Sequence, residues 1–186
     1  MNRILIACDL DNTLIHSLKY SQDSDICIEW IQKKPQGFMS IETIRLLKEL
    51  TSVAVFVPVT TRSIEQYSRI IWPDECKPKC AITSNGGIML LNDNRSPEWD
   101  KTVGIYVVSY YDEIKRMYHI LSQKSEFIRC RIVDNTYIFV YCNEGIDAKE
   151  CSQEYMKITN LNVLASGKKI YFFPPQIKKR YGDIAN

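Results

Sequence analysis

The 186 residues, 45% hydrophobic and 25% charged, are enough for one domain or for one domain with a large insertion. The formal net charge of +2 argues against a general nucleic-acid binder and against an acidic tail. The sequence has no run of about 18 apolar residues, so no membrane-spanning segment is expected. The apolar run at the N-terminus is short and lacks a small-residue cleavage site, which does not predict a signal peptide.

The sequence contains seven cysteines, an odd number, which favours reduced thiols and a cytoplasmic location. A structural zinc site needs four ligands, usually in two close pairs. Cys76 and Cys80 form only one weak pair, and the only histidines are His16 and His119. We therefore expect ordinary thiols and no zinc site.

The first 50 residues predict a strand, a flap and a helix. Residues 3–8 are a short continuous apolar run, typical of a strand covered on both faces. Residues 26–31 alternate, which predicts part of a small hairpin or flap that Gly37 ends. Residues 41–50 have apolar side chains at helical spacing after Ser40, which predicts an amphipathic helix capped by Ser40.

Two more strands follow, each ending in polar sequence. Residues 53–59 form a buried strand that ends in hydroxyl side chains, and residues 63–71 form a helix that stops before Pro73. Residues 80–83 form a third strand, followed by the glycine-rich segment 84–87. Strands that alternate with helices predict an α/β doubly wound parallel sheet, with ligands at the carboxyl ends of the strands.

After Gly87 the regular alternation of strands and helices ends. Residues 88–173 predict a β-rich α+β unit inserted into the first domain. Residues 1–87 and 174–186 are then the core. The elements expected within the insertion are a hairpin start at 88–91, a helix at 109–123, a hairpin over 131–141, a helix near 147–158, and strands at 162–164 and 169–173.

Two carboxylates, Asp9 and Asp11, follow the first strand directly. Burial of such a pair costs energy unless a cation or hydrogen bonds compensate, and the alternative role is to cap a following helix. The segment 9–14, Asp-Leu-Asp-Asn-Thr-Leu, resembles the first motif (DxDxT) of the haloacid-dehalogenase-like (HAD) phosphohydrolases. The resemblance implies a HAD-like Rossmannoid core with an inserted α+β cap.

The resemblance also implies roles for these residues. Asp9 would attack phosphorus and form an aspartyl-phosphate, and Asp11 would protonate the leaving alcohol and later activate water. The Asp9 carboxylate and the Asp11 main-chain carbonyl would bind Mg²⁺, which offsets the repulsion between the aspartate and the phosphate. Thr13 would hold the loop in shape.

A second segment, Val59-Thr60-Thr61-Arg62, resembles the Thr-Gly-Arg variant of the second motif in the Cof-like and sucrose-phosphatase-like branches. The resemblance implies that Thr60 donates to a phosphate oxygen. Thr61 replaces the glycine, so the choice between Thr60 and Thr61 stays open. Arg62 either contacts the substrate or only caps and pairs. The alternative for the whole segment is a helix cap.

Asn85, in Ser84-Asn85-Gly86-Gly87, matches an Asn-Gly segment of the same branch that borders the active site. It either faces the substrate or only forms a turn. The third motif of the family is a lysine after a proline, for which Lys179 is the first choice and Lys178 the second. The alternative for this basic run is a solvated helix face. The cap would exclude water and select the leaving group, and most of its aromatic side chains are expected in its core.

The acidic fourth motif of the family has no full counterpart, because Gly182-Asp183 matches only its first half and lies too close to Lys179. The sheet would then be incomplete at its C-terminal end, with an unpaired edge along residues 4–8. Three accounts compete: a fragment of a longer protein, which we favour; a second polypeptide or a second copy that covers the edge; or loss of turnover with phosphate-ester binding retained.

The function implied is Mg²⁺-dependent hydrolysis of a small phosphate monoester, such as a sugar phosphate, with activity impaired in this chain. One alternative is a binding or regulatory module that holds a phosphate ester without turnover. Another is a phosphotransferase or phosphomutase. The expected partner is a small phosphorylated substrate, with no nucleic acid and no membrane.

Overall fold

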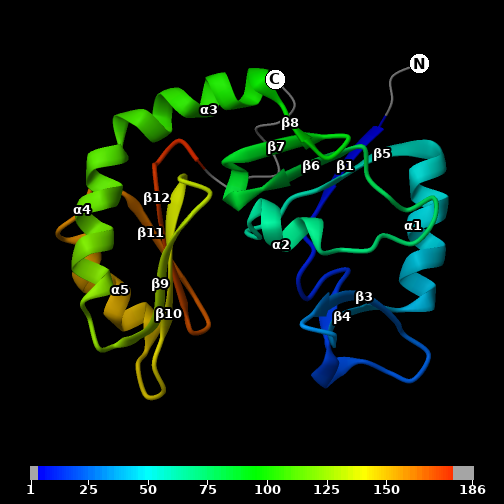
Figure 1. The fold of residues 1–186 in the computed structure, drawn as a ribbon, viewed down its shortest axis with the longest axis horizontal. Coiled ribbons are helices and arrows are strands. Elements are labelled where there is room, and N and C mark those ends of the chain that lie inside the picture. Colours follow the sequence, from blue (N-terminus) through cyan, green and yellow to red (C-terminus); the bar gives the residue numbers. More distant parts are fainter. Residues whose placement is uncertain (1–3, 178–186) are drawn as a thin grey trace. The chain divides into compact units, whose positions relative to one another are not determined.

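The computed structural model describes residues 4–177, and within them the chain forms two compact units (Figure 1). The first unit ends at Ser96 and the second begins at Pro97. Lys178, Lys179 and Gly182-Asp183 lie outside the described residues. None of the helices between residues 4 and 177 combines the length and the apolar character that crossing a bilayer requires.

The first unit is built on strands of which the first three, β1 (Ile4–Cys8), β5 (Ala54–Pro58) and β6 (Cys80–Thr83), are parallel. They are followed by β7 (Ile88–Leu91) and β8 (Asn94–Arg95). β1 runs parallel to β5, and a parallel bridge from Val59 to Ile82 joins β5 to β6. β7, which the sequence assigned to the insertion, pairs antiparallel with β6, and β8 pairs with β7. The predicted α/β arrangement with a parallel sheet is confirmed.

The prediction that the first strand is covered on both faces is wrong. Ile4 is 67% exposed and Leu5 is 49% exposed. Within residues 4–177, β1 pairs only with β5, so its other edge has no neighbouring strand there. Burial increases toward the carboxyl end of β1, where Leu10 is fully buried in the core of the unit.

Two helices of the first unit begin with side-chain caps. α1 (Ile41–Val53) starts after Ser40, whose Oγ accepts a hydrogen bond from the Thr43 N–H at 3.1 Å, as predicted. α2 (Ile64–Ser68) starts with a reciprocal capping box between Ser63 and Gln66. α2 is shorter than the predicted helix over 63–71.

A three-stranded flap precedes α1. It consists of β2 (His16–Ser17), the 3₁₀ turn η1 (Leu18–Tyr20), β3 (Ile26–Ile31) and β4 (Lys34–Met39), with β4 between β2 and β3. The prediction that Gly37 ends the hairpin is wrong, because Gly37 lies inside β4. A Cβ at position 37 would lie 3.1 Å from the Glu29 Cβ and 3.1 Å from the Ile15 Cγ2, so only glycine fits without displacement of a neighbour.

A β-bulge in β3 turns two consecutive side chains inward. Cys27 pairs with Phe38 and Glu29 pairs with Gly37, so Ile28 is an extra residue on this strand. Ile28 is 1% exposed and Glu29 is 5% exposed. The bulge therefore breaks the alternation of the strand and buries a carboxylate between the flap and the rest of the unit.

The second unit is an antiparallel sheet with helices. Its elements are α3 (Pro97–Ser109), α4 (Tyr111–Ser122), β9 (Phe127–Val133), β10 (Tyr137–Cys142), α5 (Ala148–Met156), β11 (Asn162–Ser166) and β12 (Lys169–Phe173). The sheet order is β11-β12-β10-β9. Side chains of α4 and α5, such as Met117 and Tyr155, share a buried core with Ile138 and Phe172.

α3 is the helix that the sequence did not predict. Its second half is apolar all round, and Ile105 and Val108 are 64% and 75% exposed, so no amphipathic period marks it. The aromatic residues of this unit divide between core and surface. Tyr137 is 1% exposed, whereas Tyr106 and Tyr111 are 38% and 46% exposed.

Candidate active site

The loops after β1, β5 and β6 meet at one edge of the sheet of the first unit. The Val59 N–H donates to the Cys8 carbonyl at 2.8 Å, and the Thr60 N–H donates to the Ile82 carbonyl at 2.9 Å. The Asn85 N–H donates to the Thr60 carbonyl at 3.1 Å. These backbone bonds bring together the three segments from which the sequence predicts a site, at the carboxyl ends of parallel strands.

The loop after β1 is a tight turn around the buried Leu10. The Leu10 carbonyl accepts from the N–H groups of Leu14 and Ile15, both at 2.9 Å, and from that of Thr13 at 3.2 Å. The Leu10 N–H donates to the Asp9 carboxylate at 2.8 Å. Backbone bonds thus shape the loop, and the role predicted for the Thr13 side chain stays a prediction.

Thr60 and Thr61 differ in burial. Thr60 is fully buried, and its Oγ1 accepts from the Arg62 N–H at 3.1 Å, whereas Thr61 is partly exposed. The Thr60 hydroxyl closes the turn that leads into α2 and keeps its own proton to donate. Contact of either threonine with a phosphate stays a prediction.

Asn85 lies in η2 (Ser84–Gly86) with a left-handed backbone, φ 59°, and is 3% exposed. Asparagine is one of the few residues that adopt this conformation readily. The preceding Ser84 N–H donates to the Arg62 carbonyl at 2.7 Å, which fixes this turn against the loop after β5. A contact between Asn85 and a substrate stays a prediction.

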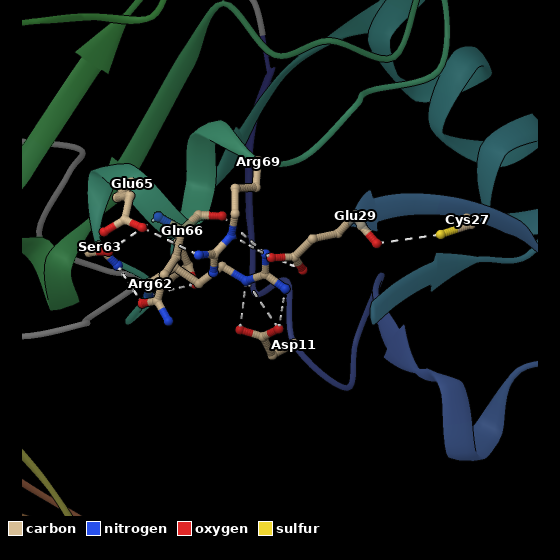
Figure 2. Close-up of polar contacts among 9 residues, drawn as sticks. Asp11, Cys27, Glu29, Arg62, Ser63, Glu65, Gln66 and Arg69 are labelled. Carbon is tan, nitrogen blue, oxygen red and sulfur yellow. Dashed lines mark hydrogen bonds and ion pairs between the residues drawn. The ribbon is translucent and has the colours of Figure 1, made fainter. Parts of the chain in front are cut away.

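A chain of charged side chains joins the first loop to the flap (Figure 2). The Arg62 Nη2 donates to the Asp11 Oδ1 at 2.8 Å, and its Nε donates to the Asp11 Oδ2 at 3.1 Å. The Arg62 Nη1 lies 2.9 Å from the Glu29 Oε2. The Arg69 Nε donates to the Glu29 Oε1 at 3.2 Å, and its Nη1 lies 3.5 Å from Glu65. Arg62 therefore pairs with two carboxylates at once.

The ion pairs of Arg62 differ in burial. The side chains of Arg62 and Glu29 are 11% and 6% exposed, whereas that of Asp11 is 45% exposed. Burial lowers the pKa of Arg62, but the hydrogen bonds and charges of Asp11 and Glu29 outweigh it and raise the pKa overall. The guanidinium is thus held in its charged form between its two partners.

Glu29 and Arg69 are residues that the sequence analysis missed. Glu29 sits in a stretch read as an alternating strand, where nothing indicates that a bulge turns the carboxylate inward. Arg69 lies just after α2, and only its contact with Glu29 brings it near the site. For Arg62 the sequence left pairing and substrate contact open, and the structure shows the pairing.

The residues present offer oxygen ligands of the kind that Mg²⁺ prefers. They are the Asp9 carboxylate and the Asp11 main-chain carbonyl. A parallel β-bridge joins Asp11 and Ile15, and its two hydrogen bonds to Ile15 come from the Leu10 carbonyl and the Asn12 N–H. This bridge therefore does not use the Asp11 carbonyl. Between residues 4 and 177, no group of three His, Cys, Asp or Glu side chains is placed to hold a metal ion.

No protein-family model and no curated protein matches the chain in sequence. Solved structures match it in fold. The C. albicans trehalose-6-phosphate phosphatase C-terminal domain matches with TM-score 0.61 and 16% identity, over 95% of this chain and 59% of that one. The sucrose-phosphatase from Synechocystis sp. PCC6803 matches with TM-score 0.58 and 13% identity, over 96% and 67%.

A trehalose-6-phosphate phosphatase related protein matches with TM-score 0.55 and 19% identity, over 94% of this chain and 69% of that one. The chain therefore spans 59% to 69% of the lengths of these three structures. At such low identity the likeness defines the fold alone. The chain has a HAD-like α/β fold, and a second compact unit follows the first from Pro97 onward.

Proposed function

We propose that this chain carries the active site of a phosphatase that hydrolyses a small phosphate monoester through an aspartyl-phosphate on Asp9. The observation that supports this proposal is the meeting of Asp9, Thr60 and Asn85 at one sheet edge of a HAD-like fold. The paired aspartates after β1 supply both groups that the reaction needs.

In the first step, a carboxylate oxygen of Asp9 attacks phosphorus, and the bond from phosphorus to the ester oxygen breaks. The leaving oxygen takes a proton from the Asp11 carboxyl group. In the second step, Asp11 takes a proton from a water molecule whose oxygen attacks phosphorus. The bond to Asp9 then breaks, inorganic phosphate leaves, and both aspartates return to their starting forms.

Other residues would hold the phosphoryl group. Thr60 would donate its hydroxyl proton to a phosphoryl oxygen, and Lys179 would neutralise charge there. Mg²⁺, held by the Asp9 carboxylate and the Asp11 carbonyl, would supply further positive charge against the phosphate oxygens.

A sugar phosphate is the substrate class that we propose. Two of the matching structures are named as trehalose-6-phosphate phosphatases or their relative, and a third is a sucrose-phosphatase bound to sucrose and phosphate. Hydrolysis of a panel of sugar phosphates, compared with a generic aryl phosphate, tests this class directly.

The deciding experiment is phosphate release from an aryl phosphate by the 186-residue chain, with and without Mg²⁺. We expect weak Mg²⁺-dependent release that is lost in Asp9→Asn, with the circular dichroism spectrum unchanged. Release that persists in Asp9→Asn contradicts the nucleophile. One alternative is a phosphate-ester-binding module without turnover. Binding of inorganic phosphate without any release would support that alternative.

Two further proposals concern the compartment of the protein and its association with other chains. The seven cysteines are all free, which supports a reducing compartment such as the cytoplasm. Ile4 and Leu5 are exposed on a strand that pairs only with β5 within residues 4–177, which supports association with a further chain or a second copy along this edge. Sedimentation at several concentrations measures self-association.

A further inference from the structure

Asp11 is held in place by one side chain. Its carboxylate is 45% exposed, and within residues 4–177 its hydrogen bonds all run to the guanidinium of Arg62. Little packing surrounds so exposed a side chain. The position of the Asp11 carboxylate therefore depends on the position of Arg62.

The guanidinium of Arg62 is in turn fixed from its other side. Its Nη1 contacts the Glu29 Oε2 at 2.9 Å and the Gln66 carbonyl at 3.4 Å, while the Nε–Nη2 edge faces Asp11. Because a guanidinium is rigid and planar, a group that fixes one edge also sets the direction of the other. Glu29 thus orients the Nε–Nη2 edge of Arg62, which donates hydrogen bonds to Asp11.

Glu29 is itself a rigid anchor. Its second carboxylate oxygen accepts from Arg69 at 3.2 Å, and Glu29 pairs with Gly37 on the neighbouring strand, where an added Cβ would lie 3.1 Å from the Glu29 Cβ. The flap also has a separate attachment, because the Ile71 N–H donates to the Ile28 carbonyl at 2.7 Å. Loss of the Glu29 charge would therefore leave the flap attached.

We propose that Glu29 is a positioning residue for the reaction: through Arg62, the flap sets where the Asp11 carboxyl group lies. The proposal rests on the proposed function, in which Asp11 is the acid and base. It goes beyond the roles proposed for Asp9 and Asp11, because it assigns an effect on the reaction to a flap residue that does not itself reach the reacting atoms. It also means that a displacement of the flap is transmitted to Asp11.

The test compares Glu29→Gln with Glu65→Gln on the full chain. Glu65 is a matched control, because it also pairs with Arg69 but is 82% exposed and does not contact Arg62. The readouts are kcat and KM for an aryl phosphate with Mg²⁺, and the ¹⁵N NMR resonance of the Arg62 Nε–H group, assigned by its loss in Arg62→Lys.

We expect Glu29→Gln to lower kcat by about 10- to 100-fold, since a misplacement of about 1 Å costs up to about 100-fold. KM should change by less than about threefold, because Asp11 acts on the leaving group and not on phosphate binding. The Arg62 Nε–H resonance should shift and exchange faster with water. Glu65→Gln should leave all three readouts unchanged.

Two results would overturn the proposal: an unchanged kcat, whether or not KM rises, or an unchanged Arg62 resonance. If the wild-type chain releases no phosphate, the proposed function fails, and the resonance alone decides whether Glu29 fixes Arg62. If Glu29→Gln does not fold, Gly37→Ala provides the second variant, because it displaces Glu29 with every charge retained. It should shift the same resonance and lower kcat.

Discussion

Replacement of Gly37 by alanine tests how tightly the flap is packed. The new Cβ would lie 3.1 Å from the Glu29 Cβ, the Glu29 Oε2 and the Ile15 Cγ2, whereas apolar contacts are favourable at about 3.5–4.0 Å. Gly37 does not have a positive φ, so the backbone itself accepts alanine. Overpacking costs about 1–3 kcal/mol, and reduced freedom of the unfolded chain returns about 0.4–1 kcal/mol. We therefore expect Gly37→Ala to destabilise the first unit by about 1–2 kcal/mol.

Urea unfolding followed by tryptophan fluorescence measures this effect, because Trp30 and Trp72 both lie in the first unit. With a slope of about 2 kcal/mol/M, the unfolding midpoint should fall by about 0.5–1 M. Gly104→Ala is the control, since a Cβ at that position in α3 would meet nothing within 4 Å beyond the adjacent residues and the backbone of the helix itself. It should stabilise α3 by about 1 kcal/mol, read from helical circular dichroism. An unchanged or raised midpoint for Gly37→Ala would refute the close approach of Glu29.

The remaining predictions concern a helix cap, a thiol and the lysine that we propose to be catalytic. Ser40→Ala removes the acceptor for the Thr43 N–H and should lower the free energy of unfolding by about 1 kcal/mol in the same urea assay. Burial raises the pKa of Cys130 to about 11, so its alkylation rate, followed by peptide mass spectrometry, should rise about tenfold per pH unit toward pH 11. A plateau near the ordinary thiol value of about 8.5 contradicts this. Lys179→Ala should abolish phosphate release, and loss in Lys178→Ala alone would show that the lysine was misassigned.

The core strands of the first unit could be predicted because each is a short apolar run that ends in polar residues. The same pattern predicts that the loops after these strands lie at one edge of the sheet, because the carboxyl ends of parallel strands face the same way. The exposure of Ile4 could not be predicted, because an apolar run does not say how many neighbouring strands a strand has. α3 was missed because its apolar residues do not follow a helical period.

From the sequence, the partner of Arg62 could be predicted only as an unspecified acceptor, either a substrate or a carboxylate of the protein. A sequence shows that an arginine follows Thr60 and Thr61, but the choice between substrate and carboxylate depends on which chain segment lies opposite. Here that segment is the flap, in which Glu29 pairs with Gly37. Gly37 was read as a strand ending because glycine usually interrupts strands, whereas its role is to leave room for a side chain on β3.

The contact between the flap and Arg62 depends on which face of β3 the Glu29 side chain occupies, because the bulge at Ile28 interrupts the alternation of that strand. A slip of β3 by one residue against β4 would turn the carboxylate at Glu29 to the other face of the flap. Asp11, Arg62 and Arg69 would all still be present, yet Arg62 would lose its buried partner. The arrangement of these charged side chains therefore depends on the register of β3 against β4 as well as on the residues of β3.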